Sequence, residues 1–160
     1  MNKKYIILVI LLIPLKAIFS QPSQRGKLIK TTITGISFKG TTAVSIWPDD
    51  ILLNQEKNDF KIKIKSKSKS KKILSCINKL TKCDSGIDCR VVIIFEYDDS
   101  SKYVLAIGNE QNYCTFYINN KGNKYNIAYF DINSELFTLV MEAMPIKQRK
   151  IKPFKYKLCK

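Results

Sequence analysis

The sequence predicts an α+β domain, a mostly antiparallel β-sheet with two helices on one face. Three observations predict it. Four strand-like segments joined by short links fill much of the C-terminal half, further strand-like segments occur in the N-terminal half, and two segments show helical periodicity. Runs of strands with helices between and after them are typical of the α+β class.

The N-terminal half contributes the first strands. Residues 26–47 are rich in Thr, Ile, Val and Ser, and Gly35 and Gly40 divide them into two short predicted strands. Pro48, followed by two aspartates, predicts one helical turn before a polar loop. In residues 60–65 apolar side chains alternate with lysines, so the period of two predicts a half-buried strand with its lysines in solvent.

A helix is predicted to follow this strand. Serines replace the apolar partners of the lysines over residues 66–70, which predicts a loop there. Ser70 is the expected N-cap of a helix near residues 70–81, because apolar residues recur at helical spacing from Ile73 to Leu80. A turn containing a glycine ends the helix.

Four strands are then expected to form an antiparallel meander. The links between them are short, and short links require antiparallel neighbours. The predicted strands are residues 90–97, 102–107, 113–118 and 124–130. Strands between residues 26 and 65 are expected to extend the same sheet or to pack beside it.

The C-terminal part begins with a second helix, predicted near residues 132–143 from apolar residues spaced four apart and a proline past its end. Ser134 or Asp131 is the expected N-cap. The final segment, residues 147–160, is basic and has no clear period. It is interpreted as a tail or an edge strand.

The first twenty residues are typical of a secretory signal peptide. A short positively charged start precedes an apolar run that ends on small residues. The run is too short for a bilayer, which needs about 20 apolar residues, although an uncleaved anchor is the alternative. Cleavage is expected after Ser20, or alternatively after Ala17. We therefore expect residues 21–146 to form one domain, secreted or periplasmic, without a stable membrane span.

The positive charge is concentrated in two segments. The formal net charge of the chain is +15, and loss of residues 1–20 leaves 25 basic and 13 acidic residues. Residues 61–72 and residues 147–160 each contain seven basic residues and no acidic one. Such clusters attract anionic polymers. The candidate polyanion-binding residues are Lys61, Lys63, Lys65, Lys67, Lys69, Lys71, Lys72, Lys147, Arg149, Lys150 and Lys152.

Five cysteines lie after the predicted signal peptide. In an exported chain they predict disulfides, with the pairing left open and at least one thiol unpaired within the chain. A metal site is disfavoured by the cysteine spacing and by the absence of histidine from the sequence, and no cofactor is expected. The candidate disulfide cysteines are Cys76, Cys83, Cys89, Cys114 and Cys159.

Catalytic patterns are sparse. A chain without histidine excludes the usual serine and cysteine triads. The S-x-x-K spacing of Ser66 with Lys69 arises automatically in a run of alternating serine and lysine. Asp98 and Asp99 form a carboxylate pair, but they fall in a predicted turn, where aspartate commonly bonds to the backbone. We therefore expect no enzymatic activity.

Tyrosines offer a second binding feature. They occupy odd positions of the predicted meander and are expected to share a face within each strand. They could form a stacking platform for sugars or bases, but we favour ordinary packing of the sheet. These tyrosines are Tyr103, Tyr113, Tyr117, Tyr125 and Tyr129.

The sequence as a whole predicts a small exported binding or interaction protein whose partner is a protein or small ligand. The alternative is a polyanion-binding protein recognising lipopolysaccharide, acidic glycans or nucleic acid.

Overall fold

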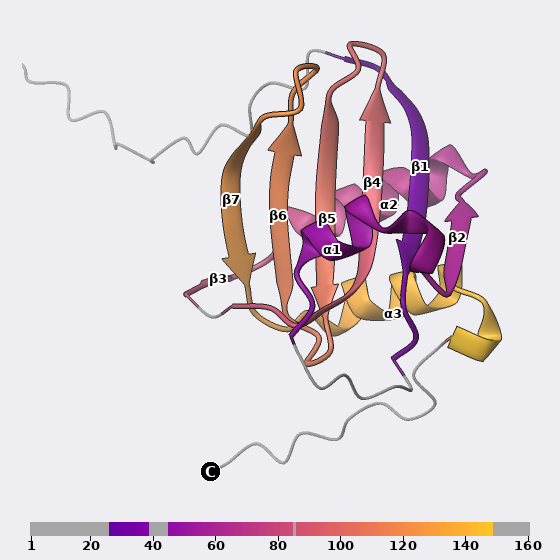
Figure 1. The fold of residues 1–160 in the computed structure, drawn as a ribbon, viewed down its shortest axis with the longest axis vertical. Helices are drawn as coiled ribbons and strands as arrows, with labels where there is room; N and C mark the ends of the chain where they lie inside the picture. The colour runs from indigo at the N-terminus through magenta and orange to yellow at the C-terminus, as the bar shows by residue number, and fades with distance from the viewer. Residues whose placement is uncertain (1–25, 39–44, 85, 149–160) are drawn as a thin grey trace, which may run out of the picture.

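The computed structural model describes residues 26–38, 45–84 and 86–148, which form a seven-stranded antiparallel sheet and three α-helices (Figure 1). The predicted α+β class is confirmed. The strand order across the sheet is β2-β1-β4-β5-β6-β7-β3. The strands are β1 (Leu28–Gly35), β2 (Phe60–Lys63), β3 (Lys82–Cys83), β4 (Cys89–Tyr97), β5 (Lys102–Gly108), β6 (Tyr113–Ile118) and β7 (Lys124–Phe130).

The helices are α1 (Pro48–Leu53), α2 (Lys67–Ile77) and α3 (Ser134–Ala143), with short 3-10 turns η1 (Gln55–Lys57) and η2 (Ile146–Gln148). In the part of the chain that the structure describes, no helix is long and apolar enough to cross a membrane. The predicted signal peptide and the C-terminal residues 149–160 lie outside the described residues.

The predicted meander is confirmed. Strands β4 to β7 follow one another in the chain, and each is hydrogen-bonded antiparallel to the next. The predicted strands of the N-terminal half extend the same sheet, because β1 pairs with β4 and β2 pairs with the outer side of β1. The second strand expected near Gly40 falls mainly on residues 39–44, outside the described residues. The two-residue strand β3 was not predicted, and it pairs with the end of β7.

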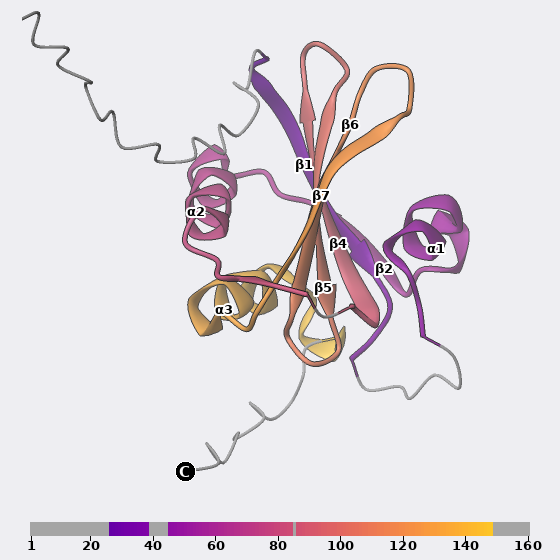
Figure 2. The ribbon, with the colours of Figure 1, turned by 90° about the vertical axis from the view of Figure 1, so that its left-hand side faces the viewer.

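The helices cover both faces of the sheet, which corrects the expectation that they share one face. Figure 2 shows α2 and α3 on one side of the sheet and α1 on the other. The physical reason lies in β4, whose apolar residues are consecutive rather than alternating, so both of its faces need cover. Val91 and Ile93 belong to the core under α2 and α3, whereas Val92 and Ile94 belong to the core under α1.

Helix α2 begins earlier than the sequence predicts. Ser66, not Ser70, is the N-cap, and its hydroxyl accepts a hydrogen bond from the Lys69 amide at 3.2 Å. The Ser70 side chain is buried and donates to the Ser66 carbonyl. The segment 66–70 expected as a loop is therefore the cap and first turn of the helix. Helix α3 is capped by Asn133, whose side chain accepts from the Leu136 amide, and not by Ser134 or Asp131.

A β-bulge changes the orientation of β7. The pairing of β6 with β7 shifts by one residue between Thr115 and Tyr117, and Asn126 in this segment has a positive φ of 54°. Tyr125 therefore stacks on Tyr117 under α2 and α3, whereas Tyr129 packs in the core on the α1 face. The expectation that the tyrosines of one strand share a face is confirmed for Tyr113 and Tyr117 on β6 and is wrong for Tyr125 and Tyr129 on β7.

Candidate functional site

A concavity lined by several lysines lies at the edge of the sheet where β1 extends beyond β2. Strand β2 pairs only with residues 32–35 of β1, and the chain then crosses to the start of α2. The Ile64 amide donates to the Thr31 carbonyl at 2.9 Å and holds this crossing against β1. A groove of about 200 Å³ remains between the first half of β1 and the first turn of α2.

We call this concavity the lysine groove. It is lined by Leu28, Ile29, Lys30, Thr31, Lys63, Ile64, Lys65, Lys67 and Ser70. Four of these nine residues are lysines, and none is acidic. The two aliphatic side chains Leu28 and Ile64 pack against the core below, so the charged groups stand on an apolar base.

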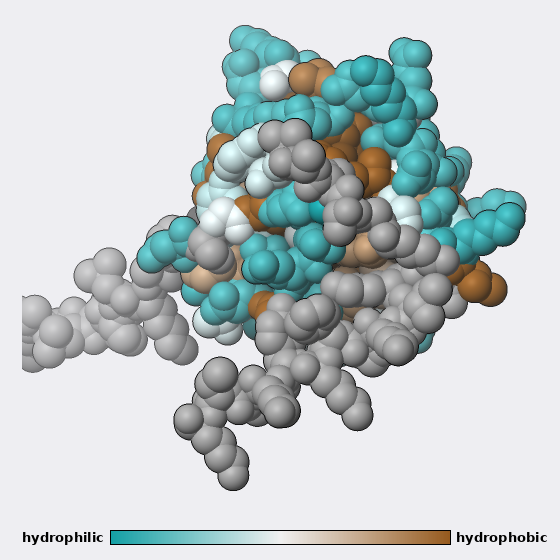
Figure 3. All heavy atoms as spheres, turned by 60° about the horizontal axis from the view of Figure 1, so that its bottom comes forward, coloured by the Kyte–Doolittle hydropathy of each residue, from teal (hydrophilic) through white to brown (hydrophobic). Residues whose placement is uncertain are grey.

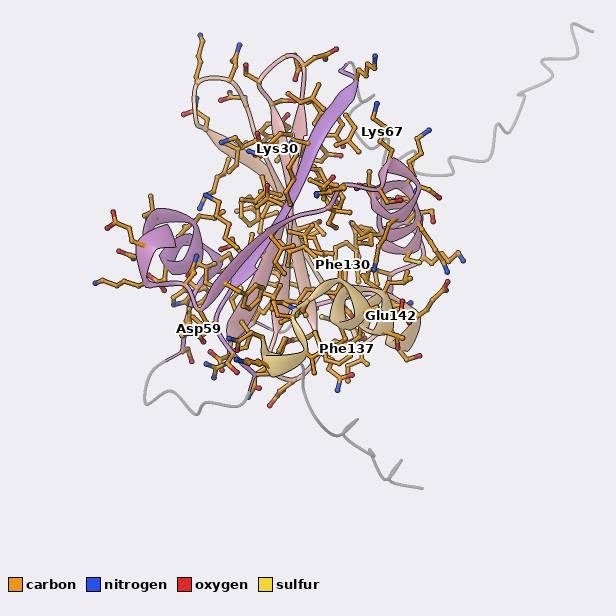
Figure 4. The ribbon with its side chains drawn as sticks, turned by 90° about the vertical axis from the view of Figure 1, so that its right-hand side faces the viewer. Lys30, Asp59, Lys67, Phe130, Phe137 and Glu142 are labelled. Carbon is orange, nitrogen blue, oxygen red and sulfur yellow. The ribbon has the colours of Figure 1, made fainter. Side chains whose placement is uncertain are left out.

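The lysines of the groove come from three elements. Figure 4 faces the β2 edge and shows Lys30 on β1 and Lys67 at the start of α2, both in the upper half of the molecule. The Lys30 ammonium lies 2.9 Å from the Glu96 carboxylate. Within the described residues, no ion pair is formed by Lys63, Lys65 or Lys67. Three exposed positive charges are therefore left uncompensated on one strip of surface.

Helix stability does not explain these lysines. The first turn of α2 contains no acidic residue, although the positive end of the helix dipole favours acidic side chains there. Lys67 and Lys69 instead occupy this turn, where their charge is mildly unfavourable. An anion from outside the chain would relieve the repulsion among these groups.

The remaining candidate lysines lie elsewhere. Lys61 pairs with Thr34 near the other end of β2 and does not line the groove. Lys71 and Lys72 are exposed on α2, Lys69 is half-buried, and Lys147 lies in η2 after α3. Arg149, Lys150 and Lys152 lie outside the described residues.

Lys30 is the groove residue that sequence reasoning missed. It stands alone among apolar and threonine residues of β1, so it belongs to neither basic segment. Strands β1 and β2 are far apart in the sequence, and only their pairing brings Lys30 into the same groove as Lys63. The charge pattern by itself contains no signal for this contact.

The carboxylates and serines considered for catalysis have structural partners. Asp98 accepts from the Lys27 amide at 2.8 Å, and Asp99 accepts from the Ser101 amide at 2.9 Å, as expected in a turn. Asp88, a further carboxylate before β4, accepts from the Ile46 amide and forms an ion pair with Arg90. The Ser66 hydroxyl caps α2, which assigns it a structural role.

The buried cysteines are poor nucleophiles. Burial raises the pKa of Cys114 to about 11 and also raises the pKa values of Cys76 and Cys89, so all three are protonated near neutral pH. Cys76, Cys89 and Cys114 are free thiols in the structure, and Cys159 lies outside the described residues. Disulfide formation stays a prediction. No group of three metal-ligating side chains occurs in the described residues.

The buried tyrosines form a row across the sheet rather than an exposed platform. Phe95, Tyr103, Tyr117 and Tyr125 are stacked in order on β4 to β7, with ring centroids 6.1, 4.6 and 5.4 Å apart. Tyr103 and Tyr117 are only 5% and 8% exposed. Tyr113 is also buried and donates its hydroxyl to the Asn133 carbonyl at 2.8 Å. Tyr103, Tyr113 and Tyr117 therefore pack the sheet and leave little ring surface for a ligand, whereas Tyr125 at the end of the row is exposed.

No protein-family model matches this chain, and neither a curated protein nor a solved structure matches it. Its function has to be inferred from the chemistry of its own surface. Among the coloured residues at the end of the molecule that Figure 3 shows, hydrophilic residues predominate, with hydrophobic residues between them. Of three concavities among the described residues, only the lysine groove is lined by several charges of one sign.

Proposed function

We propose that this protein is an exported, non-enzymatic binding protein whose lysine groove binds an acidic polymer. One observation carries the proposal: Lys63, Lys65 and Lys67 line a single groove with Lys30, and no acidic residue lines it. Several lysine side chains beside one groove attract a chain of anionic groups and release its counterions. The expected signal peptide at residues 1–20 supports export, which would bring the groove to lipopolysaccharide, acidic glycans or released nucleic acid.

A second candidate function is the binding of a small, largely apolar ligand. A pocket of about 480 Å³ lies beside α1 and η1, within the size range of small-molecule sites. Its lining includes Ile36, Ile46 and Ile51 together with the polar Asn54 and Asn58. A small uncharged compound recovered with the purified protein, which also ignored acidic polymers, would favour this function.

The polyanion proposal is tested by replacing Lys63, Lys65 and Lys67 together with glutamine. The change removes three positive charges from the groove and should weaken binding to heparin and to a short DNA duplex. Each lost phosphate contact should reduce the slope of log affinity against log salt by roughly 0.9 on DNA. Retention is measured on immobilised heparin, and DNA affinity is measured at several salt concentrations.

A matched variant controls for net charge. Lys57, Lys102 and Lys121 are exposed and lie outside the groove, so their replacement by glutamine removes the same charge. We expect the control variant to retain most of the binding. Both variants should unfold within about 0.5 kcal/mol of the wild type, because the changes are on the surface. Equal loss of binding in the two variants would show that net charge, and not the groove, is responsible.

A further inference from the structure

A third and smaller pocket lies on the opposite side of the sheet from α2 and α3. It has a volume of about 130 Å³ and is bounded by the first residues of α1 and by strands β6 and β7. Figure 2 shows α1 on this side of the sheet, away from the other two helices. We call it the Trp47 pocket, after the residue immediately before α1.

The pocket has aromatic and apolar walls. Phe116 is 3% exposed and belongs to the core below, whereas Trp47 is 53% exposed beside the opening. Ile127 is 56% exposed, and Tyr129 is half-buried. A tryptophan usually buries most of its large apolar surface, so an indole left half open beside a concavity is available for contact with a ligand.

The bulge in β7 creates part of these walls. If β7 were a regular strand without the bulge, the alternation that places Tyr125 on the face of α2 and α3 would place Ile127 and Tyr129 there too. The bulge turns both side chains to the α1 face, where they line the pocket. Bulges are over-represented beside functional sites, where they redirect side chains in this way.

The polar edge of the pocket is electrically balanced. Lys124 of β7 forms an ion pair with Asp49 of α1, and both residues line the pocket. The Lys124 ammonium also lies 5.1 Å from the centre of the Phe116 ring. The pocket thus offers a hydrogen-bond donor and an acceptor with no net charge, in contrast to the lysine groove.

We infer that the Trp47 pocket binds one ring of a neutral sugar. A pyranose ring has an apolar C–H face that packs on indole and phenol rings, and its hydroxyls both donate to a carboxylate and accept from an ammonium group. A pocket of about 130 Å³ has room for a single ring. The ion pair leaves the pocket without net charge, so the pocket has no electrostatic preference for a charged ligand over a neutral one. This site is separate from the groove proposed to bind acidic polymers.

The chain supplies its own reporter for the test, because Trp47 is its single tryptophan. The full-length protein is titrated with glucose, galactose, N-acetylglucosamine, cellotetraose and chitotetraose while tryptophan emission is recorded. At least one sugar should give a saturable change. In calorimetry, Trp47→Ala should lower the affinity for that sugar about tenfold, the typical loss for one aromatic contact. Lys124→Met should also weaken binding.

Leu53→Ala is the matched control, because Leu53 is 82% exposed on the same helix and does not line the pocket. Sugar binding should be unchanged in this variant, and circular dichroism should show that every variant is folded. The inference is overturned if none of the five sugars changes the emission or gives a calorimetric signal. It is also overturned if Trp47→Ala leaves the sugar affinity unchanged, or if toluene binds in the pocket while the sugars do not.

Discussion

At the scale of single residues, Gly35 determines how closely β1 approaches β4. It pairs with Val91, and the next residue, Ile36, donates its amide to the Arg90 carbonyl at 2.9 Å. A Cβ atom at position 35 would collide with that carbonyl oxygen and would lie 2.9 Å from the Val91 Cα atom. Both neighbours are backbone, so neither can move aside as a flexible side chain would.

Replacing Gly35 with alanine should therefore destabilise the fold. We expect a loss of about 1–3 kcal/mol in the free energy of unfolding, the usual effect of forcing an extra carbon into a packed site. Urea denaturation followed by circular dichroism measures it. Gly86→Ala is the control, because a Cβ at Gly86 would meet no atom within 4 Å, and its stability should match the wild type. Equal stability of the two variants would contradict this account of the β1–β4 contact.

At the scale of elements, the N-cap of α2 holds the first turn that borders the lysine groove. Ser66→Ala removes the hydroxyl that accepts from the Lys69 amide, and we expect unfolding to become easier by about 1 kcal/mol. Ser68→Ala is the matched comparison within the same turn, because Ser68 is exposed and alanine is a good helix former. Thermal denaturation of both variants distinguishes them. A Ser68 variant at least as unstable as the Ser66 variant would exclude the capping role.

Some elements of the fold could be predicted from the sequence and others could not. The meander strands are predictable because their apolar runs are long and their turns are short. The start of α2 is not, because alternating serine and lysine fit a period of two and give no helical signal until Ile73. The hydrogen bond that the Ser66 hydroxyl accepts sets the first residue of α2, and it is seen only in the structure. The bulge at Asn126 is likewise unmarked in the sequence, so the side of the sheet that Tyr129 occupies could not be foreseen.

Most residues of the candidate site could be predicted from the sequence, but their arrangement around one groove could not. The run of lysines identified Lys63, Lys65 and Lys67 as exposed basic residues, which the structure confirms. Their arrangement around a groove depends on the length difference between β1 and β2, a property of strand pairing. Lys30 enters the site for the same reason.

At the scale of the whole molecule, buried tyrosines make the stability of the fold decrease with rising pH in the alkaline range. Burial raises the pKa of Tyr97 from 10.0 to about 12 and also raises the pKa values of Tyr103 and Tyr113. The unfolded chain therefore loses these protons before the folded chain does. Stability from Tyr97 is fully present below pH 10 and is lost as the pH rises towards 12.

We accordingly expect the melting temperature to fall steadily between pH 10 and pH 12. Tyr97→Phe should reduce this fall. The Tyr97 hydroxyl is buried without a hydrogen-bond partner in the described part of the chain, so the variant should be at least as stable as the wild type near pH 7. Differential scanning calorimetry across the pH range measures both effects. An identical pH dependence in the two proteins would show that Tyr97 does not contribute.

The sheet also keeps the three buried cysteines apart. Cys76 lies in the core under α2 and α3, whereas Cys89 and Cys114 lie in the core on the α1 face, with β5 between their strands. Two strand spacings come to about 10 Å, and the Cα atoms of a disulfide lie within about 7 Å. A bridge between two of these thiols can form only before the sheet closes. In an oxidising compartment, a molecule that contains such a bridge was oxidised before its sheet formed. The number of free thiols per molecule in a purified sample therefore shows whether oxidation or folding came first.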